Sequence, residues 1–286
     1  MDKEPNVLPW AHGATDMTPD GTPGGMPPDP YMLRRGNTDG PVHDPAVKTV
    51  RELPRRKEAG ADSAEAEENS TPLREALKGF FSSEQIGRLQ SAQVGIVGCG
   101  GLGSNVALML ARSGIEQFLL ADGDAVDVSN LTRQQYWPCH VGMPKVDALS
   151  ELLTELNPAV HIEPIRRMLT PEELPSLLPV CTLWIEAVDA PETKAAMTTA
   201  ALIAGRNIIS ASGMAGMGGP GMQVKRVGSL TLAGDLVSDV AEAHPYAPRV
   251  AQAAALMADA VLQILLDGTP GIPPFAGSVK ADTIAD

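Results

Sequence analysis

The sequence predicts an α/β fold, in which helices cover both faces of a doubly wound, mostly parallel β-sheet. Three observations lead to this fold class. Short apolar and β-branched runs alternate with helical patterns between residues 93 and 212, a glycine cluster joins the first run to the first long helical pattern, and 43% of the 286 residues are hydrophobic. Repeated strand–helix units of this size place parallel strands side by side around a substantial core.

Two short helices are expected first. Thr71 before Pro72 has the pattern of an N-cap followed by a first-turn proline, and residues 82–85, Ser-Ser-Glu-Gln, fit a capping box. Strands and helices then alternate. The expected strands are Gln93–Gly98, Gln117–Ala121, Val160–Ile165, Thr182–Ala187 and Asn207–Ser212, and the expected helices are Leu102–Arg112, Pro144–Leu156, Pro171–Leu178 and Glu192–Ala204.

The pattern changes after Ser212. A segment rich in Gly and Met, Gly213–Gly221, precedes two short strand-like pieces, Gln223–Val227 and Leu230–Leu232. We expect a loop, then antiparallel strands at the C-terminal edge of the sheet, and finally an apolar helix over Ala247–Leu266.

The chain divides into three parts. Residues 1–70 carry ten of the 25 prolines and no periodic apolar pattern, so we interpret them as a disordered, acidic extension rich in Pro and Gly. Residues 71–268 are the predicted folded domain. Residues 269–286, which contain Pro270, Pro273 and Pro274, are expected to form a flexible tail.

Composition and charge exclude several classes of function. The net charge of −13 repels nucleic acid and anionic lipid, so we expect neither as a partner. The longest uninterrupted apolar runs, such as Val106–Ala111 and Ala253–Ala258, are far shorter than the ~20 residues that cross a bilayer. The amino terminus has no basic patch before an apolar stretch, which predicts a cytoplasmic protein.

The three cysteines are expected to be free thiols. They are far apart in sequence and form no Cys-x-x-Cys pair, which argues against a disulfide framework and against a four-cysteine zinc site. Cys99 and Cys181 fit small packing positions. Cys139, in a polar loop, is the candidate for a reactive thiol, although a passive role is favoured there too.

Residues 98–103, Gly-Cys-Gly-Gly-Leu-Gly, carry the clearest chemical signal. They end a strand and open a helix, so unpaired backbone N–H groups and the positive end of the helix dipole face one crevice. Gly98, Gly100, Gly101 and Gly103 let a phosphate approach the backbone without meeting a Cβ. The segment therefore predicts an anion-binding turn in a Rossmann-like fold.

Two acidic residues follow the second strand. Asp122 lies about 20 residues past the glycines, where an acidic side chain typically accepts hydrogen bonds from ribose hydroxyls. Asp124 either assists it or is a turn residue beside Gly123. These features suit NAD as well as ATP.

Three further residues favour ATP. Arg133 and Lys145 can neutralise phosphate oxygens, and Asp189, at the end of a later strand, can help to hold Mg²⁺. Ligands of open α/β sheets lie beyond the carboxyl ends of the strands, so Asp189 is expected to face the same crevice as the glycines. Hydride transfer does not need this combination.

The combined motifs resemble the ThiF, MoeB and HesA proteins of the ubiquitin-activating-enzyme-like superfamily. The motifs are the glycine segment 98–104, Asp122-x-Asp124, Ser129-Asn130-Leu131-Thr132-Arg133-Gln134, Gly142-x-Pro144-Lys145 and Glu186-Ala187-Val188-Asp189. The resemblance covers roughly residues 75–266 and is greatest for a short ThiF variant.

The resemblance implies ATP-dependent adenylylation of the C-terminal glycine carboxylate of a ubiquitin-fold sulfur carrier, which for ThiF is ThiS in thiamine thiazole synthesis. It also implies a homodimer and Mg²⁺ as the only metal. Arg133, Lys145 and Asp189 would be the catalytic residues. The implied ATP site comprises Gly98, Gly100, Gly101, Gly103, Asp122, Asp124, Ser129, Asn130, Leu131, Thr132, Arg133, Lys145, Asp189 and Ala190.

This chain departs from the family pattern at several points. The family often has an Arg-x-x-Arg-Gln segment before the first strand, with an arginine that reaches the partner subunit's ATP site, but Gln85–Gln93 offers only Arg88. Ala190 stands where asparagine is common. The two Cys-x-x-Cys pairs that hold zinc in longer members are absent.

Several other side chains have both a functional and a structural interpretation. Met214, Met217 and Met222 could form an adaptable contact for a flexible carrier tail, or fill a gap beside an edge loop. Lys194 and Arg249 could touch phosphate or a partner, but a solvated cation on a helix is the more common state.

Two alternative functions remain open. A dehydratase of the same superfamily activates a carboxylate on a modified tRNA base, although the acidic composition disfavours tRNA. A nicotinamide-binding dehydrogenase, or a nucleotide sensor without chemistry, would also fit the Gly98-x-Gly100-x-x-Gly103 spacing.

Overall fold

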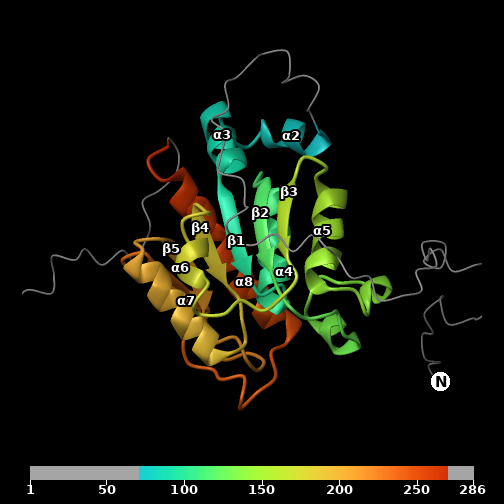
Figure 1. Cartoon of the computed structure of the whole chain (residues 1–286), viewed down its shortest axis with the longest axis vertical. Helices are drawn as coiled ribbons and strands as arrows, with labels where there is room; N and C mark the ends of the chain where they lie inside the picture. Colours follow the sequence, from blue (N-terminus) through green and yellow to red (C-terminus); the bar gives the residue numbers. More distant parts are fainter. Residues whose placement is uncertain (1–70, 270–286) are drawn as a thin grey trace, which may run out of the picture. The chain divides into compact units, whose positions relative to one another are not determined.

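The structure is a computed structural model that describes residues 71–269 of the chain. The extension predicted over residues 1–70 lies outside the described residues, as does the predicted tail from residue 270 onward. Within the described range, one β-sheet lies between two layers of helices (Figure 1). The predicted α/β fold is therefore confirmed.

The sheet has seven strands in the order β3-β2-β1-β4-β5-β7-β6. All neighbouring pairs are parallel except β6 and β7, so the predicted antiparallel pairing at the C-terminal edge is confirmed. The strand order reverses between β1 and β4, which creates a crevice at the carboxyl ends of these two strands. The strands are β1 (Gln93–Val97), β2 (Gln117–Ala121), β3 (His161–Ile165), β4 (Leu183–Glu186), β5 (Asn207–Ala211), β6 (Gln223–Val227) and β7 (Leu230–Gly234).

Helices cover both faces of this sheet. One layer contains α3 (Ser83–Ser91), α4 (Gly101–Arg112), α5 (Lys145–Leu156) and α8 (Ala247–Leu266), and the other contains α6 (Leu174–Leu177) and α7 (Pro191–Ile203). The pleat of the strands divides the core in the same way. Ile96 and Phe118 point into the first layer, whereas Leu119 and Trp184 point into the second. Residue 95 is glycine because a Cβ there would lie 2.3 Å from the Trp184 ring.

The two N-terminal helices begin as predicted. Thr71 accepts a hydrogen bond from the backbone of Arg74 at the start of α2 (Pro72–Leu77), and Ser82 and Gln85 form a complete capping box at the start of α3. Thr269, expected as the first residue of a flexible tail, is instead buried. Its hydroxyl donates to the carbonyl of Leu266 (2.7 Å) and accepts from the Gln85 side-chain amide (3.1 Å).

The helix predicted over Pro171–Leu178 is wrong in its extent, because α6 has only four residues, Leu174–Leu177. The Glu173 carboxylate accepts hydrogen bonds from the Thr170 backbone (3.0 Å) and from Arg167 (2.7 Å). These bonds close a turn before the helix begins. Two short 3₁₀ helices, η3 (Val128–Thr132) and η4 (Pro138–His140), were not part of the predicted pattern.

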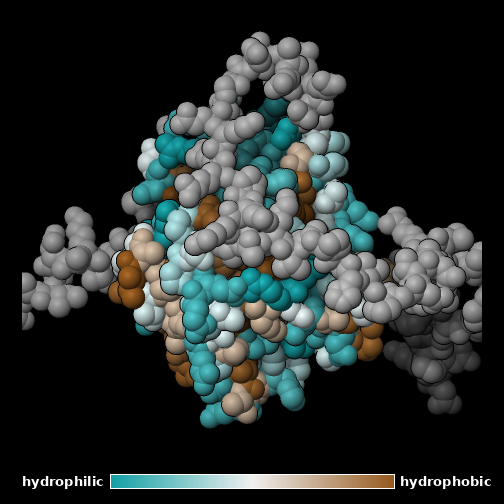
Figure 2. All heavy atoms as spheres, viewed as in Figure 1, coloured by the Kyte–Doolittle hydropathy of each residue, from teal (hydrophilic) through white to brown (hydrophobic). Residues whose placement is uncertain are grey.

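Helix α8 is long and apolar enough, by length and composition alone, to cross a membrane. Uninterrupted apolar runs do not reveal this, because isolated polar residues divide the helix. Half of its apolar window is buried, and the helix packs on α4, β5 and β7. Its contacts with these elements of the core therefore account for its apolar face. On the part of the surface that Figure 2 shows in colour, apolar residues are interspersed with hydrophilic ones.

Candidate functional site

The glycine segment lies at the carboxyl edge of the sheet, between β1 and α4. Gly98 has a φ of +93°, and a Cβ placed on it would lie 2.4 Å from the carbonyl oxygen of Ala187. A Cβ on Gly103 would lie 1.8 Å from the carbonyl oxygen of Gly98. Gly100 caps α4 without any side-chain hydrogen bond, so the first-turn N–H groups are not covered by a capping side chain. Such a helix start is suited to bind an anion.

Asp122 organises this turn. One of its carboxylate oxygens accepts a hydrogen bond from the backbone N–H of Cys99 (2.7 Å), and the other accepts from the backbone N–H of Asp124 (2.8 Å). Asp122 is buried. Its predicted contact with ribose hydroxyls stays a prediction, and the structure adds a second role, which is to pin the glycine turn to the loop after β2.

Lys145 and Asp124 form an ion pair, with 2.6 Å between the ammonium and the carboxylate. The lysine side chain is 10% exposed and the aspartate side chain 52% exposed. The backbone N–H of Lys145 also donates to the carbonyl of Asp124 (2.8 Å). The Tyr136 hydroxyl lies 2.6 Å from the carbonyl oxygen of Cys99, to which it donates, and 3.2 Å from that of Lys145. Tyr136 therefore connects the glycine turn to the start of α5.

Arg133 lies against the N-terminus of α4. A Cβ on Gly101 would be 3.7 Å from Cγ of Arg133. The amide of Asn105 donates to the carbonyls of Gly101 (2.6 Å) and Arg133 (3.2 Å), which joins the helix to the segment that follows η3. Gln134 is buried beside Gly100, and its Oε1 has no hydrogen-bond partner in the described structure.

The rest of the predicted 129–132 segment forms η3 itself. Asn130 completes a capping box with Asp127, and the carbonyl of Ser129 accepts hydrogen bonds from Thr132 (2.8 Å) and from the Arg133 guanidinium (3.3 Å). Leu131 packs against the core. These residues shape the backbone that carries Arg133.

Asp189 and Ala190 lie in the short turn between β4 and α7. Both are exposed. Ala190 is the N-cap of α7 and contributes no side-chain cap. Within residues 71–269, the Asp189 carboxylate makes no hydrogen bond or ion pair, which leaves its oxygens available to a ligand.

The three residues predicted to be catalytic therefore surround one loop. The Arg133 side chain lies beside Gly101, and the Tyr136 hydroxyl links the backbone carbonyl of Lys145 to that of Cys99. Asp189 follows Ala187 and Val188, whose backbone packs on Gly98. They come from three separate loops at the carboxyl edge of the sheet. Two residues with cationic side chains and one with a carboxylate thus lie on loops that contact the glycine turn beside an uncapped helix N-terminus, an arrangement suited to a nucleotide polyphosphate.

The site also fits a magnesium ion that arrives with a nucleotide. Among the described residues, no group of three His, Cys, Asp or Glu side chains could by itself hold a metal. Magnesium usually binds through one or two carboxylates together with substrate phosphates and water. Asp189 supplies one such carboxylate.

Three residues that build the site have no individual role in the functional prediction from the sequence. Tyr136, Asn105 and Glu186 are all buried and hydrogen-bonded to backbone atoms of the loops around the glycine turn. Glu186 was detectable in principle, because an ionisable residue at the end of a strand that is otherwise apolar requires a partner.

The cysteines are free thiols, as predicted. Cys99 and Cys181 are buried, and burial raises the pKa of both thiols well above the usual range. Both are packing residues. Cys139 is exposed.

The expectation that Lys194 and Arg249 are solvated is wrong for Arg249, which is buried, and holds only in part for Lys194, whose side chain is 33% exposed. Lys194 lies 2.5 Å from the buried carboxylate of Glu186. Arg249 is buried, pairs with Asp235, and donates to the carbonyl of Pro220 (2.9 Å). In each case a buried carboxylate on the adjacent strand or loop draws the cation inward, which the linear sequence does not reveal.

The Gly- and Met-rich loop borders a hollow of about 440 Å³ at the start of α8, lined by the loop residues 216–221 together with Tyr246, Pro248, Arg249 and Gln252. Met217 is exposed, whereas Met214 and Met222 pack against the core. Val250 connects this region to the glycine turn, since a Cβ on Gly101 would lie 3.2 Å from its Cγ1.

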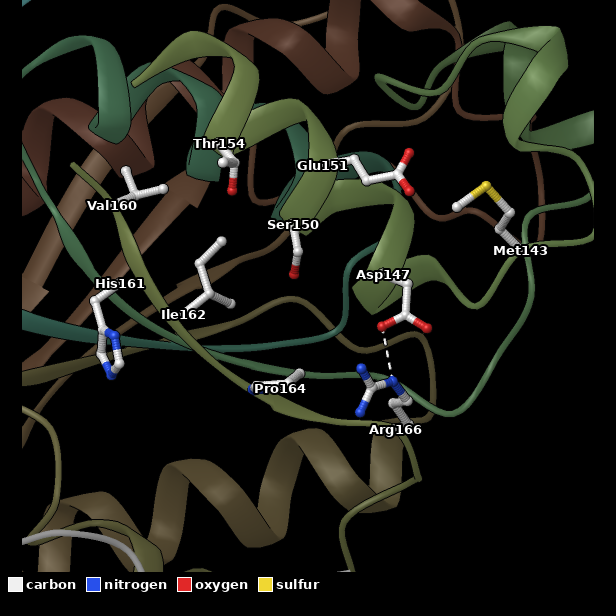
Figure 3. A pocket seen from close by; sticks show the side chains of 10 residues that line it. All are labelled: Met143, Asp147, Ser150, Glu151, Thr154, Val160, His161, Ile162, Pro164 and Arg166. Atoms are coloured by element: carbon white, nitrogen blue, oxygen red, sulfur yellow. Dashed lines mark hydrogen bonds and ion pairs between the residues drawn. The ribbon is translucent and has the colours of Figure 1, made fainter. Parts of the chain in front are cut away.

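A second hollow, of about 580 Å³, lies between α5 and the edge strand β3 (Figure 3). None of the predicted site residues lines it. Asp147 and Arg166 form an ion pair across it, with 2.7 Å between carboxylate oxygen and guanidinium Nε. Of the two carboxylates that line the hollow, Asp147 is therefore neutralised within the protein.

Comparison with solved structures supports the fold. E. coli tRNA N6-threonylcarbamoyladenosine dehydratase, TcdA, in complex with AMP, superposes with a TM-score of 0.62 at 20% identity, over 67% of this chain and 93% of that chain. E. coli MccB with ATP gives a TM-score of 0.51 at 24% identity, over 63% of this chain and 57% of that one. At these identities the likeness concerns the fold alone.

Comparison with curated sequences gives higher identity over a shorter region. The adenylyltransferase and sulfurtransferase uba4 of Aspergillus terreus is 42% identical over 128 residues, which are 44% of this chain and 26% of that protein. UBA4 of Candida glabrata is 35% identical over 128 residues, 44% of this chain and 30% of that protein. The matched region spans only about a quarter to a third of these relatives.

The sequence profile of the ThiF family matches residues 73–281. This match includes every residue of the glycine turn and its surrounding loops and extends over more than half of the chain. The chain therefore belongs to the ThiF family.

Proposed function

We propose that this protein is an ATP-dependent adenylyltransferase that activates the C-terminal carboxylate of a ubiquitin-fold sulfur carrier. The observation that carries the proposal is the placement of Arg133, Lys145 and Asp189 around the uncapped N-terminus of α4. Membership of the ThiF family and the names of the uba4 relatives support the same chemistry.

In the proposed reaction, a carboxylate oxygen of the carrier attacks the α-phosphorus of ATP. A new bond forms between that oxygen and phosphorus, the bond from the α-phosphorus to the bridging oxygen breaks, and pyrophosphate leaves with the electron pair. The attacking carboxylate is already ionised at neutral pH, so no general base is required. The protein contributes positioning and charge stabilisation.

Each site residue has a distinct task in this proposal. The first-turn N–H groups of α4 and the Arg133 guanidinium bind phosphate oxygens. The Lys145 ammonium exchanges its resting partner, Asp124, for a phosphate oxygen as ATP enters. Mg²⁺, when bound with ATP, would neutralise further charge on the phosphates, and Asp189 is the residue to hold it.

In this proposal, the carrier's tail approaches along the Gly- and Met-rich loop. The 440 Å³ hollow beside residues 216–221 begins next to Val250, which contacts the Gly101 position. An extended tail in this hollow would bring its terminal carboxylate toward the glycine turn. Within this proposal we favour a ThiS-like carrier in thiamine thiazole synthesis and a homodimeric enzyme.

The test is mass spectrometry of candidate ubiquitin-fold carriers after incubation with the protein, ATP and Mg²⁺. We expect the carrier to gain the mass of one AMP, and the gain to disappear with a carrier that lacks its terminal glycine. Asp189→Asn is expected to lose the adduct while remaining folded. Absence of any adduct with all ubiquitin-fold carriers, together with retained binding of modified tRNA, would replace this proposal with the dehydratase function.

A further inference from the structure

Glu186 is the last residue of β4, and the proposed chemistry leaves it without a task. Its side chain is fully buried. One carboxylate oxygen accepts a hydrogen bond from the backbone N–H of Val188 (2.9 Å). The other accepts from the Lys194 ammonium (2.5 Å) and from the Ser210 hydroxyl (2.5 Å).

The bond to Val188 fixes the peptide that immediately precedes Asp189. Only four residues, 187–190, separate β4 from α7, and the Asp189 side chain has no partner within residues 71–269. The direction of its carboxylate therefore depends on the backbone of this turn. The side chain that holds the backbone of this turn, through the Val188 N–H, is that of Glu186.

The same turn forms a wall of the glycine loop. A Cβ on Gly98 would lie 2.4 Å from the Ala187 carbonyl oxygen and 3.1 Å from the backbone nitrogen of Val188. The N–H of Ala187 donates to the carbonyl of Val97 (2.8 Å), which continues the pairing of β4 with β1. A shift of the turn would therefore change both the position of Asp189 and the packing of the phosphate cradle.

The network around Glu186 is built to stay in place. A buried carboxylate is costly unless its oxygens are satisfied, and here donors from three elements satisfy it. Lys194, on α7, also lies 3.4 Å from the Ser210 hydroxyl and 3.4 Å from the Ala211 carbonyl at the end of β5. The carboxylate thus joins β4, α7 and β5 at the edge of the sheet that carries the site.

We propose that Glu186 is a positioning residue, which orders the turn that carries Asp189 and thereby sets how strongly ATP and Mg²⁺ bind together. This inference rests on the proposed function, because it assumes that Asp189 shares the metal with the phosphates. Residues that orient a metal ligand typically change metal affinity or activity by about 10- to 100-fold when they are removed.

The experiment measures the dissociation constant of ATP by titration calorimetry, once with Mg²⁺ and once with EDTA. The ratio of the two constants is the magnesium effect. We expect Asp189→Ala to abolish this effect. The double variant Glu186→Ala/Lys194→Ala, which leaves no unpaired buried charge, is expected to reduce it by about tenfold or more.

A second double variant separates the hydrogen bond from the ion pair. Glu186→Gln/Lys194→Met retains an oxygen that can accept the Val188 N–H, and it removes both charges. We expect its magnesium effect to stay within about threefold of the wild type, because a neutral acceptor preserves the turn. If this variant loses as much of the magnesium effect as the double alanine variant, the loss comes from the ion pair and not from the order of the turn, and the proposal is overturned.

The matched control is another buried ion pair, far from the site. Glu116 pairs with Arg74 (2.6 Å) just before β2, and therefore lies at the opposite edge of the sheet from the glycine turn. Arg74→Ala/Glu116→Ala is expected to lower stability and leave the magnesium effect unchanged. An equal loss in this control would show that general destabilisation, and not positioning, explains the Glu186 result.

Hydrogen exchange on the ligand-free proteins keeps the inference separate from the proposed function. Amides of residues 187–190 should exchange faster in Glu186→Ala/Lys194→Ala than in Glu186→Gln/Lys194→Met. Should the wild type bind no ATP, the proposed function fails, and this comparison still decides whether Glu186 orders the turn. Equal exchange in the two double variants overturns the inference.

Discussion

The ammonium of Lys145 lies 2.6 Å from a carboxylate oxygen of Asp124. The residue predicted to neutralise phosphate charge thus has a carboxylate partner within the protein. Asp124 is half exposed and Lys145 is largely buried, so the carboxylate is the more accessible partner of the pair. In the proposed function, nucleotide binding would therefore involve an exchange of partners at Lys145.

Removal of the Asp124 carboxylate, the partner of Lys145, should increase the affinity for ATP. Asp124→Asn leaves Lys145 in place and removes a negative charge from a site for a polyanion. Since Asp124 is solvent-exposed, we expect a modest effect, with ATP binding about two- to fivefold tighter by calorimetry. Lys145→Met should weaken binding and serves as the opposite control. Weaker binding by Asp124→Asn would instead assign Asp124 a direct contact with the nucleotide.

Substitution at Gly103, the last glycine of the turn, should destabilise the fold. A Cβ on Gly103 would lie 1.8 Å from the Gly98 carbonyl oxygen, so the α4 start and the glycine turn cannot both stay in place. We expect Gly103→Ala to cost about 1–3 kcal/mol or more in urea unfolding. The control is Gly87→Ala in α3, where a Cβ meets nothing within 4 Å. It should stabilise by about 0.5–1 kcal/mol, because alanine is the better helix former.

The ion pair of Arg249 with Asp235 predicts a specific pH dependence of stability. Desolvation alone would raise the pKa of Asp235, but hydrogen bonds from Ser238 and Val237 and the charge of Arg249 outweigh it and lower the pKa to about 2. The pKa of Asp235 is therefore lower in the folded protein than in the unfolded chain, where an aspartate has a pKa of about 3.9. The ionised carboxylate stabilises the fold above about pH 3.9, and this stability is lost as the pH falls toward 2.

The measurement compares the wild type with Asp235→Asn. Urea midpoints should differ most above about pH 4, and the difference should shrink as the pH falls from about 4 to about 2. The opposite trend, with a difference that grows in acid, would mean that the carboxylate is destabilised by its burial.

Thiol chemistry should distinguish the three cysteines. Cys139 is exposed, whereas Cys99 and Cys181 are buried with raised pKa values. We expect one rapidly reacting thiol in the native protein with an aromatic disulfide reagent and three after denaturation. Cys139→Ser should abolish the rapid reaction and leave ATP affinity unchanged. A rapid reaction that persists in this variant would indicate that the glycine turn opens and makes Cys99 accessible.

Much of the fold was predictable because its signals are local. The strand Gln117–Ala121 and the helix Ala247–Leu266 have the predicted boundaries, and the caps at Thr71 and Ser82 form as their sequences indicate. The exception is at Pro171, where the cap pattern predicted a helix but Arg167 and Thr170 engage Glu173 and close a turn instead.

The candidate site was predictable only in part. Its cradle and its charged residues follow from short motifs, and the rule that ligands lie beyond the carboxyl ends of parallel strands places them together. The partners of these residues did not follow. Asp122 binds the Cys99 backbone, Lys145 rests on Asp124, and Lys194 turns inward to Glu186.

The sequence by itself determined the order of strands and helices, the glycine turn and the family, because these depend on periodicity, on capping and on contiguous motifs. Tertiary structure alone decided which carboxylate holds which cation and which residues orient the turn before Asp189. The physical reason is burial: an ionisable group removed from water takes whichever partner the fold brings within reach, and that partner lies on another element of the chain.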